Sequence, residues 1–288
     1  MYTILQEYVF VSWRYFVASR SRTPLTQAKF EKYVKEGRGS GSGKDYRPWI
    51  GVGDYSSRGR SHRILGWKSR RIHHFLSDHE KRVFLLLEWA DCVVDIREQF
   101  PLLDRELLDR VTNDMGVKSS TDSEAQEMYI PTTDFMLSVK RGDCIYDEVL
   151  TIKQSQDLNK KDVAKKLEIE RRYFHEKKIS WKIITEKDYS RLMVDNIELV
   201  HSAYQLADDE FLNNTAIADA CISLKSKLKQ PGLIVRDVAN ELDVELNLQQ
   251  GQSFELFKYL LATKQIIVDF SMVQVSAMLP TSSITNII

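Results

Sequence analysis

The feature that most constrains the fold is a pair of apolar-rich stretches joined by a short turn. Residues 133–139 and 145–153 have the side-chain pattern of two strands, and the Lys-Arg-Gly-Asp segment at 140–143 has the composition of a hairpin turn. An amphipathic helix is predicted next, at residues 158–178, followed by a strand at 181–185. A hairpin, a helix and a strand in this order predict a sheet that is covered by helices.

A helix and a strand are also predicted before the hairpin. Residues 77–89 begin with the Ser-x-x-Glu spacing of a capping box, which predicts a helix, and residues 92–96 predict a buried strand. Residues 99–103 leave that strand as an extended segment, and a short helix is expected around Glu106. Together these elements predict an α/β fold at residues 26–185, with a mixed sheet flanked by helices.

The pattern changes after residue 186. Helical periodicity is found at residues 189–206, 217–228, 235–242 and 253–262, after which the stretches 265–270 and 272–276 predict a small antiparallel pair. Three helices followed by a β-pair is the order of a winged-helix module. We therefore expect an N-terminal extension at 1–25, an α/β domain at 26–185 and a mostly helical, winged-helix-like domain at 186–288.

Charge is balanced overall but is uneven along the chain. The totals of 41 Lys+Arg and 41 Asp+Glu give no sign of a polyanion partner. However, residues 14–74 carry 15 basic and 4 acidic side chains, whereas residues 86–150 carry 6 and 15. A basic arm followed by an acidic middle fits a nucleic-acid-binding surface beside a cation site, and two solvated faces of opposite sign are the alternative explanation.

The basic arm contains a glycine-rich loop at residues 37–49. It does not match a P-loop, because Arg38 stands at the first glycine position and Asp45 follows Lys44. The loop is either a flexible linker or a segment that lies along a nucleic-acid backbone. The residues expected to bind DNA are Arg38, Lys44, Arg47, Arg58, Arg60, Arg63, Arg70 and Arg71.

Cysteine and histidine patterns argue against several other kinds of site. The three cysteines lie far apart and form no CxxC pair, which disfavours a disulfide framework and a zinc site, and no HExxH pattern occurs. The apolar stretch at residues 2–17 is interrupted by charge and is too short to span a membrane. We therefore expect a cytoplasmic protein that does not act at a membrane.

A few residues of the α/β domain have the chemistry that phosphodiester hydrolysis requires. Mg²⁺ prefers oxygen ligands, and a nearby lysine can orient or deprotonate the attacking water. Asp134 begins one hairpin strand and Lys153 ends the other, so antiparallel pairing brings them to the same end of the sheet. Thr151 shares a face with Lys153, whereas Ile152 points into the core and leaves its carbonyl oxygen available. Glu80, in the first turn of the preceding helix, could reach the same edge.

This arrangement resembles the PD-(D/E)xK nuclease core, a pattern that is weakly specific by itself. Each member also has a simpler explanation. Glu80 could serve only in its capping box, Asp134 could be a turn residue at the start of a strand, and Lys153 could be a solvated strand end.

Longer strings are similar to the TnsA family, the endonuclease subunits of heteromeric cut-and-paste transposases. They are KEGRG at 35–39, GKDY at 43–46, PW at 48–49, GRSHRI at 59–64, HHFLSDHE at 73–80, LEW at 87–89, DIREQFPL at 95–102 and EIERRY at 168–173. The resemblance implies a restriction-endonuclease-like fold, a catalytic set of Glu80, Asp134 and Lys153, and magnesium held by Glu80, Asp134 and the Ile152 carbonyl. Mn²⁺ is expected to be able to replace Mg²⁺.

One position departs from the family pattern. The residue two before the lysine is acidic in most nucleases of this class and glutamine in TnsA, but is Thr151 here. A hydroxyl is a poorer metal ligand than a carboxylate, so Thr151 could act through a metal-bound water, and a full second metal site is in doubt.

The resemblance also implies partners. TnsA-like proteins cut the 5′, non-transferred strand at transposon ends, a TnsB-like DDE transposase cuts the 3′ ends, and a TnsC-like AAA+ ATPase regulates both. Residues 205–288 carry 6 basic and 10 acidic side chains, which favours docking to the ATPase over unaided DNA binding. The alternatives are a stand-alone restriction or repair endonuclease, and a non-catalytic factor that bridges DNA and the ATPase.

Overall fold

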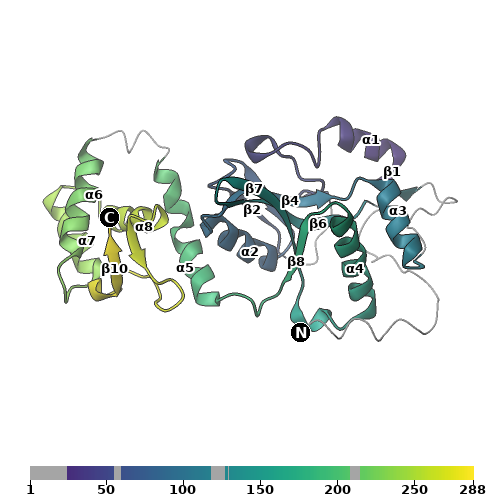
Figure 1. The fold of residues 1–288 in the computed structure, drawn as a ribbon. Helices are drawn as coiled ribbons and strands as arrows, with labels where there is room; N and C mark the ends of the chain where they lie inside the picture. The colour runs from purple at the N-terminus through teal and green to yellow at the C-terminus, as the bar shows by residue number, and fades with distance from the viewer. Residues whose placement is uncertain (1–24, 55–59, 118–126, 129, 208–214) are drawn as a thin grey trace.

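The computed structural model describes residues 25–54, 60–117, 127–128, 130–207 and 215–288 (Figure 1). The first part of the chain contains β1 (Leu25–Thr26), α1 (Gln27–Lys35), the short 3₁₀ helix η1 (Gly43–Asp45), β2 (His62–Leu65), β3 (Ile72–Phe75), α2 (Asp78–Trp89), β4 (Val93–Pro101), α3 (Arg105–Asp114) and β5 (Glu127–Met128). The extension expected at 1–25 lies almost wholly outside the described residues, as do Arg58 and the segment 208–214.

The second part begins with the hairpin and ends with a small sheet. It contains β6 (Thr132–Arg141), β7 (Cys144–Ile152), η2 (Ser155–Asp157), α4 (Lys161–Glu176), β8 (Ser180–Ile184), α5 (Arg191–His201), η3 (Ser202–Ala207), α6 (Thr215–Leu228), α7 (Val235–Glu245), α8 (Gln252–Ala262), β9 (Ile266–Val268), η4 (Thr281–Ser283) and β10 (Ile284–Ile287).

The central sheet has four strands in the order β4-β6-β7-β8. β6 pairs antiparallel with both β4 and β7, whereas β7 and β8 are parallel, so the predicted mixed sheet is confirmed. The hairpin turn is tighter than expected. Arg141 pairs with Cys144, so only Gly142 and Asp143 form the turn, and the positive φ of 60° at Gly142 suits a two-residue hairpin.

Alternate residues of β6 contribute to cores on opposite faces of the sheet. Phe135 and Leu137 pack with the buried face of α2, and Met136 packs with the buried faces of α3 and α4. Helices therefore flank the sheet on both sides (Figure 1). This is the layered arrangement expected of a restriction-endonuclease-like fold.

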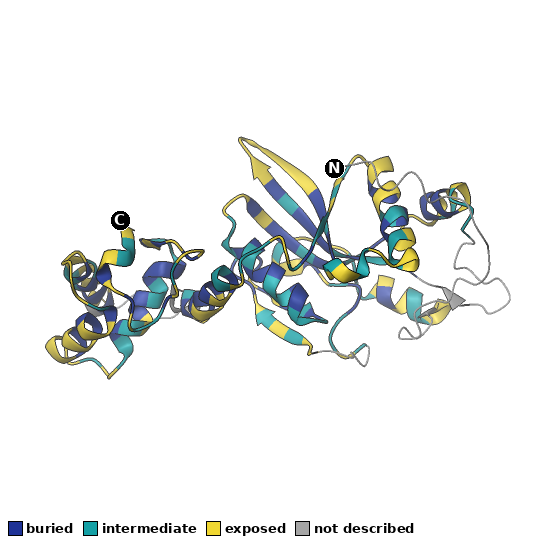
Figure 2. Cartoon of the chain, turned by 90° about the horizontal axis from the view of Figure 1, so that it is seen from below, coloured by how far each residue is buried: buried dark blue, intermediate teal, exposed yellow. Residues whose placement is uncertain are grey.

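The C-terminal part, from α5 onward, packs around a second apolar core, to which Trp67 and Leu85 of the first part also contribute (Figure 2). Helices α6, α7 and α8 are followed by an antiparallel pair, as a winged-helix-like order requires. Within the described residues, none of the helices is long and apolar enough to cross a membrane.

One strand of that pair was predicted wrongly. Residues 272–276 do not form a strand, and β9 pairs instead with β10 at Ile284–Ile287. The alternating Val273 and Val275 misled the prediction because they pack against α5. The amide of Asn196 on α5 donates to the Val273 carbonyl at 2.7 Å and accepts from the Val275 N–H at 2.8 Å, which occupies the backbone groups that a strand would use.

The two parts of the molecule share an aromatic contact. Trp67, which precedes β3, stacks on His201 and Tyr204 with ring centroids 4.7 and 4.6 Å apart, and its Nε1 donates to the His201 carbonyl at 3.0 Å. At the end of α2, Trp89 stacks on Phe270 at 4.7 Å. Helix α2 is therefore held between the central sheet and the C-terminal helices.

A buried ionic network joins β3 to β4. Glu98 is 1% exposed and accepts from Arg71 at 2.5 and 2.8 Å and from His73 at 2.8 Å. Burial opposes ionisation of this carboxyl, but His73 and Arg71 outweigh it and hold the pKa of Glu98 at about 2. The network fixes the strand that precedes α2 against the edge strand of the central sheet.

We predict that Glu98→Gln lowers the free energy of unfolding by about 3–5 kcal/mol, because it leaves the Arg71 guanidinium buried without its counter-charge. Urea unfolding at neutral pH measures this, with the exposed Glu176→Gln as a control that should change stability by less than about 0.5 kcal/mol. Equal stability of wild type and Glu98→Gln would contradict the structural role of the network.

The same network predicts an acid-sensitive stability. The pKa of Glu98 is about 2 in the folded protein and near 4.5 when unfolded, so its contribution is complete above pH 4.5 and is lost as pH falls toward 2. The difference corresponds to roughly 3 kcal/mol. Unfolding measured across this range should show a steeper acid loss in wild type than in Glu98→Gln, and parallel curves would contradict the assignment.

Candidate active site

The hairpin brings Asp134, Ile152 and Lys153 together at one end of the central sheet. The Ile152 N–H donates to Asp134 Oδ2 at 2.6 Å, and the Lys153 ammonium donates to the Ile152 carbonyl at 2.7 Å. Lys153 Nζ also lies 3.5 Å from Asp134 Oδ2. These contacts follow from the register of the hairpin, in which Phe135 pairs with Leu150 and Asp134 therefore stands opposite Thr151.

Glu80 faces this group from the first turn of α2. It has the capping role, since its N–H donates to Ser77 Oγ at 3.1 Å, while its carboxylate accepts from Ser77 Oγ at 2.9 Å and from the Leu76 N–H at 3.0 Å. Burial raises the pKa of Glu80 to about 7, and the charge of Asp134 adds to the rise. The Glu80 carboxylate therefore caps α2 and also lies close enough to Asp134 to interact with its charge.

Lys153 is held in its charged form. Burial by itself would lower its pKa, but attraction to Asp134 and Glu170 outweighs burial, and the pKa of Lys153 lies above its usual value. A lysine in this state donates hydrogen bonds and positive charge, and is a poor proton acceptor at neutral pH.

Glu170 on α4 is a member of the site that the sequence reasoning missed. The Thr151 hydroxyl donates to Glu170 Oε1 at 2.5 Å and accepts from Trp181 Nε1 at 3.0 Å. Burial raises the pKa of Glu170 despite hydrogen bonds from Thr133 and Thr151. A carboxyl group therefore lies beside Thr151, but it belongs to Glu170 of helix α4 and not to a residue of strand β7.

The donor set at this end of the sheet fits a hard divalent cation. It comprises the carboxylates of Glu80 and Asp134 and the Ile152 carbonyl, all of them oxygen donors. The Lys153 ammonium contacts two of these groups, so the space between them already holds a positive charge. Among the described residues, no group of three or more His, Cys, Asp or Glu side chains is placed to hold a metal ion.

The residues expected to bind DNA fall into two groups. Arg38 is engaged with Glu36 and Asp54 at 2.8 and 2.7 Å, and the buried Arg71 belongs to the Glu98 network. The exposed residues are Lys44, Arg47, Arg60, Arg63 and Arg70. Arg60 and Arg63 flank His62 of β2, which contacts Asp78 in the first turn of α2 at 2.7 Å, so these two arginines lie next to the turn that carries Glu80. Arg70 lies instead over the ring of Tyr204, 5.7 Å from its centroid.

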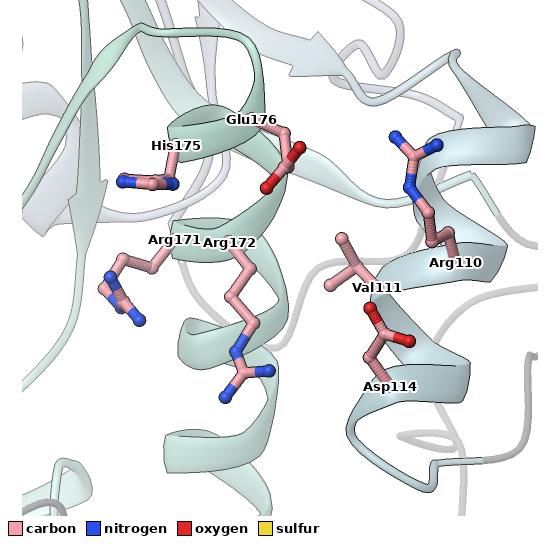
Figure 3. A pocket seen from close by; sticks show the side chains of 7 residues that line it. All are labelled: Arg110, Val111, Asp114, Arg171, Arg172, His175 and Glu176. Atoms are coloured by element: carbon pink, nitrogen blue, oxygen red, sulfur yellow. The ribbon is translucent and has the colours of Figure 1, made fainter.

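A cavity of about 500 Å³ between α3 and α4 is separate from these residues (Figure 3). Its lining comprises Arg110, Val111, Asp114, Arg171, Arg172, His175 and Glu176. In Figure 3 the carboxylates of Asp114 and Glu176 face the gap together with basic side chains, so its surface has mixed charge. None of the candidate catalytic residues lines it.

Comparison with known proteins identifies the family. The model described as "TnsA-like endonuclease N terminal" matches residues 90–186, and the one described as "TnsA endonuclease C terminal" matches residues 188–270. The chain is 39% identical over 184 residues to the Transposon Tn7 transposition protein TnsA of Escherichia coli, a match that covers 64% of this chain and 66% of that protein.

Asp134, Lys153 and Glu170 lie within the first family match, whereas Glu80 precedes it. The two matches together extend over the sheet, from β4 to β8, and over the helices that follow it. The chain therefore belongs to the TnsA endonuclease family.

Proposed function

We propose that this protein is a magnesium-dependent endonuclease that hydrolyses the 5′, non-transferred strand at the ends of a cut-and-paste transposon. The observation that carries the proposal is the meeting of Glu80, Asp134, the Ile152 carbonyl and Lys153 at one end of the sheet. When bound there, magnesium (or Mn²⁺ in its place) supplies a Lewis acid that polarises the phosphoryl oxygens and activates water.

The proposed ligands are Glu80, Asp134 and the Ile152 carbonyl. The elevated pKa of Glu80 supports this assignment, because burial and repulsion from Asp134 disfavour two neighbouring negative charges unless a cation lies nearby. The Ile152 N–H fixes one oxygen of Asp134 and leaves the other available.

Lys153, in this proposal, donates hydrogen bonds and charge to the attacking water or the reacting phosphate. Its raised pKa argues against a role as the general base. Glu170 contributes to that raised pKa, and Thr151 holds the Glu170 carboxyl in place. We therefore assign Thr151 a supporting role through Glu170, in place of a direct role at the metal.

DNA is proposed to lie along the exposed basic residues, of which Arg60 and Arg63 lie beside the N-terminus of α2. Lys44, Arg47, Arg60, Arg63 and Arg70 would contact phosphates, which position the duplex without reading its sequence. Arg38 and Arg71 are left out of this surface because their charges are engaged by acidic side chains of the same chain.

We further propose a division of labour between residues 26–185, as catalytic domain, and residues 186–288, as docking domain. Residues 205–288 carry more acidic than basic side chains, which suits a protein partner better than DNA alone. The proposed partners are a TnsB-like transposase and, through the docking domain, a TnsC-like ATPase.

Strand-specific cleavage tests the proposal. Asp134→Asn should lower 5′-strand cutting of a labelled transposon-end duplex in Mg²⁺ by more than about 100-fold, since changes to residues that merely support metal ligands already cost 10–100-fold. Asp143→Asn, the same change at the opposite, exposed end of the hairpin, is the control and should cut normally. Reactions are run with and without the transposase and the ATPase.

Partner-dependent 5′ cutting that Asp134→Asn abolishes supports the proposal in full. Cutting by the protein alone points to a stand-alone nuclease, and unchanged cutting by Asp134→Asn removes the site assignment.

The role given to Thr151 predicts a stability change. Thr151→Val removes one of the two hydroxyls that donate to the Glu170 carboxyl and leaves the indole N–H of Trp181 without its acceptor, and should lower the free energy of unfolding by about 1–3 kcal/mol. Thr151→Ser keeps the hydroxyl and should recover most of that loss. If valine is tolerated as well as serine in urea unfolding, Thr151 does not hold Glu170.

A further inference from the structure

Gln99 has an unusual backbone for a residue inside a strand. It lies within β4, is 3% exposed, and has a φ of +49°. A side chain other than glycine is rarely found in this left-handed region, and it persists there only where the surrounding structure enforces it. Such strain is often found at functional sites.

Gln99 stands directly across the sheet from Asp134. Glu98 pairs with Phe135 and Phe100 pairs with Thr133, which places Gln99 opposite Asp134 in the same register. Gln99 and Asp134 are not themselves registered as a pair, so the ladder is interrupted at this position. The strained residue and a proposed metal ligand are therefore neighbours on adjacent strands.

The side chain of Gln99 reaches the other proposed ligand. Its Nε2 donates to Glu80 Oε2 at 3.3 Å, and its Oε1 accepts from the Thr132 hydroxyl at 3.2 Å. An ionised Glu80 carboxylate only accepts hydrogen bonds, so it faces the amide nitrogen of Gln99, and the Thr132 hydroxyl, which can donate or accept, donates to Oε1. The Gln99 carbonyl also accepts from the Trp49 N–H at 3.3 Å, so the residue is fixed at its backbone as well as at its side chain.

The amide suits a position beside a metal ligand. The Glu80 carboxylate accepts three hydrogen bonds. Its Oε2 accepts from the Leu76 N–H and the Gln99 side-chain amide, and its Oε1 accepts from the Ser77 hydroxyl. All three donors are neutral. They orient the carboxylate without neutralising it, whereas a lysine or arginine at position 99 would compete with a cation for the same oxygens.

We propose that Gln99 is a positioning residue that holds the Glu80 carboxylate for the divalent cation, and that its strained backbone conformation is kept for this purpose. This inference rests on the proposed function, because it takes Glu80 as a ligand. Gln99 acts through Glu80 and need not touch DNA or the reacting phosphate.

The test is Mn²⁺ binding by the full-length protein, measured by isothermal titration calorimetry in the absence of DNA. Gln99→Met keeps the size of the side chain and removes the donor. Gln99→Gly relieves the backbone strain and also removes the donor. Lys178→Gly is the matched control, since Lys178 has a comparable φ of +57° at an exposed position after α4 and lies outside the proposed site.

Both Gln99 variants should bind Mn²⁺ about 10–100-fold more weakly than wild type, as changes beside metal ligands typically do, while Lys178→Gly binds normally. Thr132→Val, which removes the hydroxyl that holds Gln99, should weaken Mn²⁺ binding in the same direction and by less. Circular dichroism melts are recorded for every variant, and binding is compared below the transition, where each is folded.

Cleavage kinetics provide a second readout. In the partner-containing cleavage reaction, the Mg²⁺ concentration for half-maximal rate should rise about 10-fold or more in Gln99→Met, whereas the KM for transposon-end DNA stays unchanged. If Gln99 only supported the fold, its replacement would not raise the Mg²⁺ requirement while leaving the KM for DNA unchanged.

The outcomes distinguish this inference from the proposed function. Wild-type Mn²⁺ affinity in folded Gln99→Met and Gln99→Gly, together with loss of binding in Asp134→Asn, overturns the role of Gln99 and leaves the metal site intact. Absence of Mn²⁺ binding in the wild-type protein overturns the metal site and this inference together.

Discussion

The register of the β6–β7 hairpin is the constraint on which the site depends. Its two-residue turn aligns Phe135 with Leu150, and the same alignment brings Asp134 to the Ile152 N–H and to the Lys153 ammonium. A slip of one residue would move every side chain of one strand to the opposite face. The apolar cores on the two sides of the sheet prevent such a slip, because Phe135 and Met136 are each buried against different helices.

Helix α2 links the proposed site to the rest of the molecule. Its first turn presents Glu80 to Asp134, and its last turn packs Trp89 against Phe270 of the C-terminal part. Strand β4 supports it from the other side, with Glu98 in the buried ionic network and Gln99 against Glu80. Helix α2 therefore connects Glu80 with the C-terminal part of the molecule.

Local patterns in the sequence were sufficient to predict the mixed sheet. Alternating apolar side chains, a Gly-Asp turn and a capping box defined the hairpin and α2, and they brought Asp134 and Lys153 to one end of the sheet. The same kind of pattern failed at residues 272–276, where alternating valines pack against α5 without pairing, because Asn196 occupies their backbone groups. Periodicity shows that residues are buried, but it does not identify what covers them.

Glu170 and Gln99 could not have been identified in that way. Glu170 lies in a helix rich in charged residues, and only the packing of α4 on β7 brings it to the Thr151 hydroxyl. The sequence did give one indication, because position 151 carries a threonine where most nucleases of this class have an acid, so a carboxylate from another element could take that place. Gln99 gives no local signal, because its role depends on a φ value and on a contact with Glu80, which lies 19 residues earlier in the chain.

Glu80, Asp134 and the Ile152 carbonyl are proposed to form a divalent-cation site together. Anomalous diffraction from crystals of the protein grown with Mn²⁺ would locate the cation. We expect an anomalous peak within coordination distance of all three groups, with the Lys153 ammonium displaced from between them. A peak elsewhere, or none at this end of the sheet at saturating Mn²⁺, would show that these groups do not form the cation site.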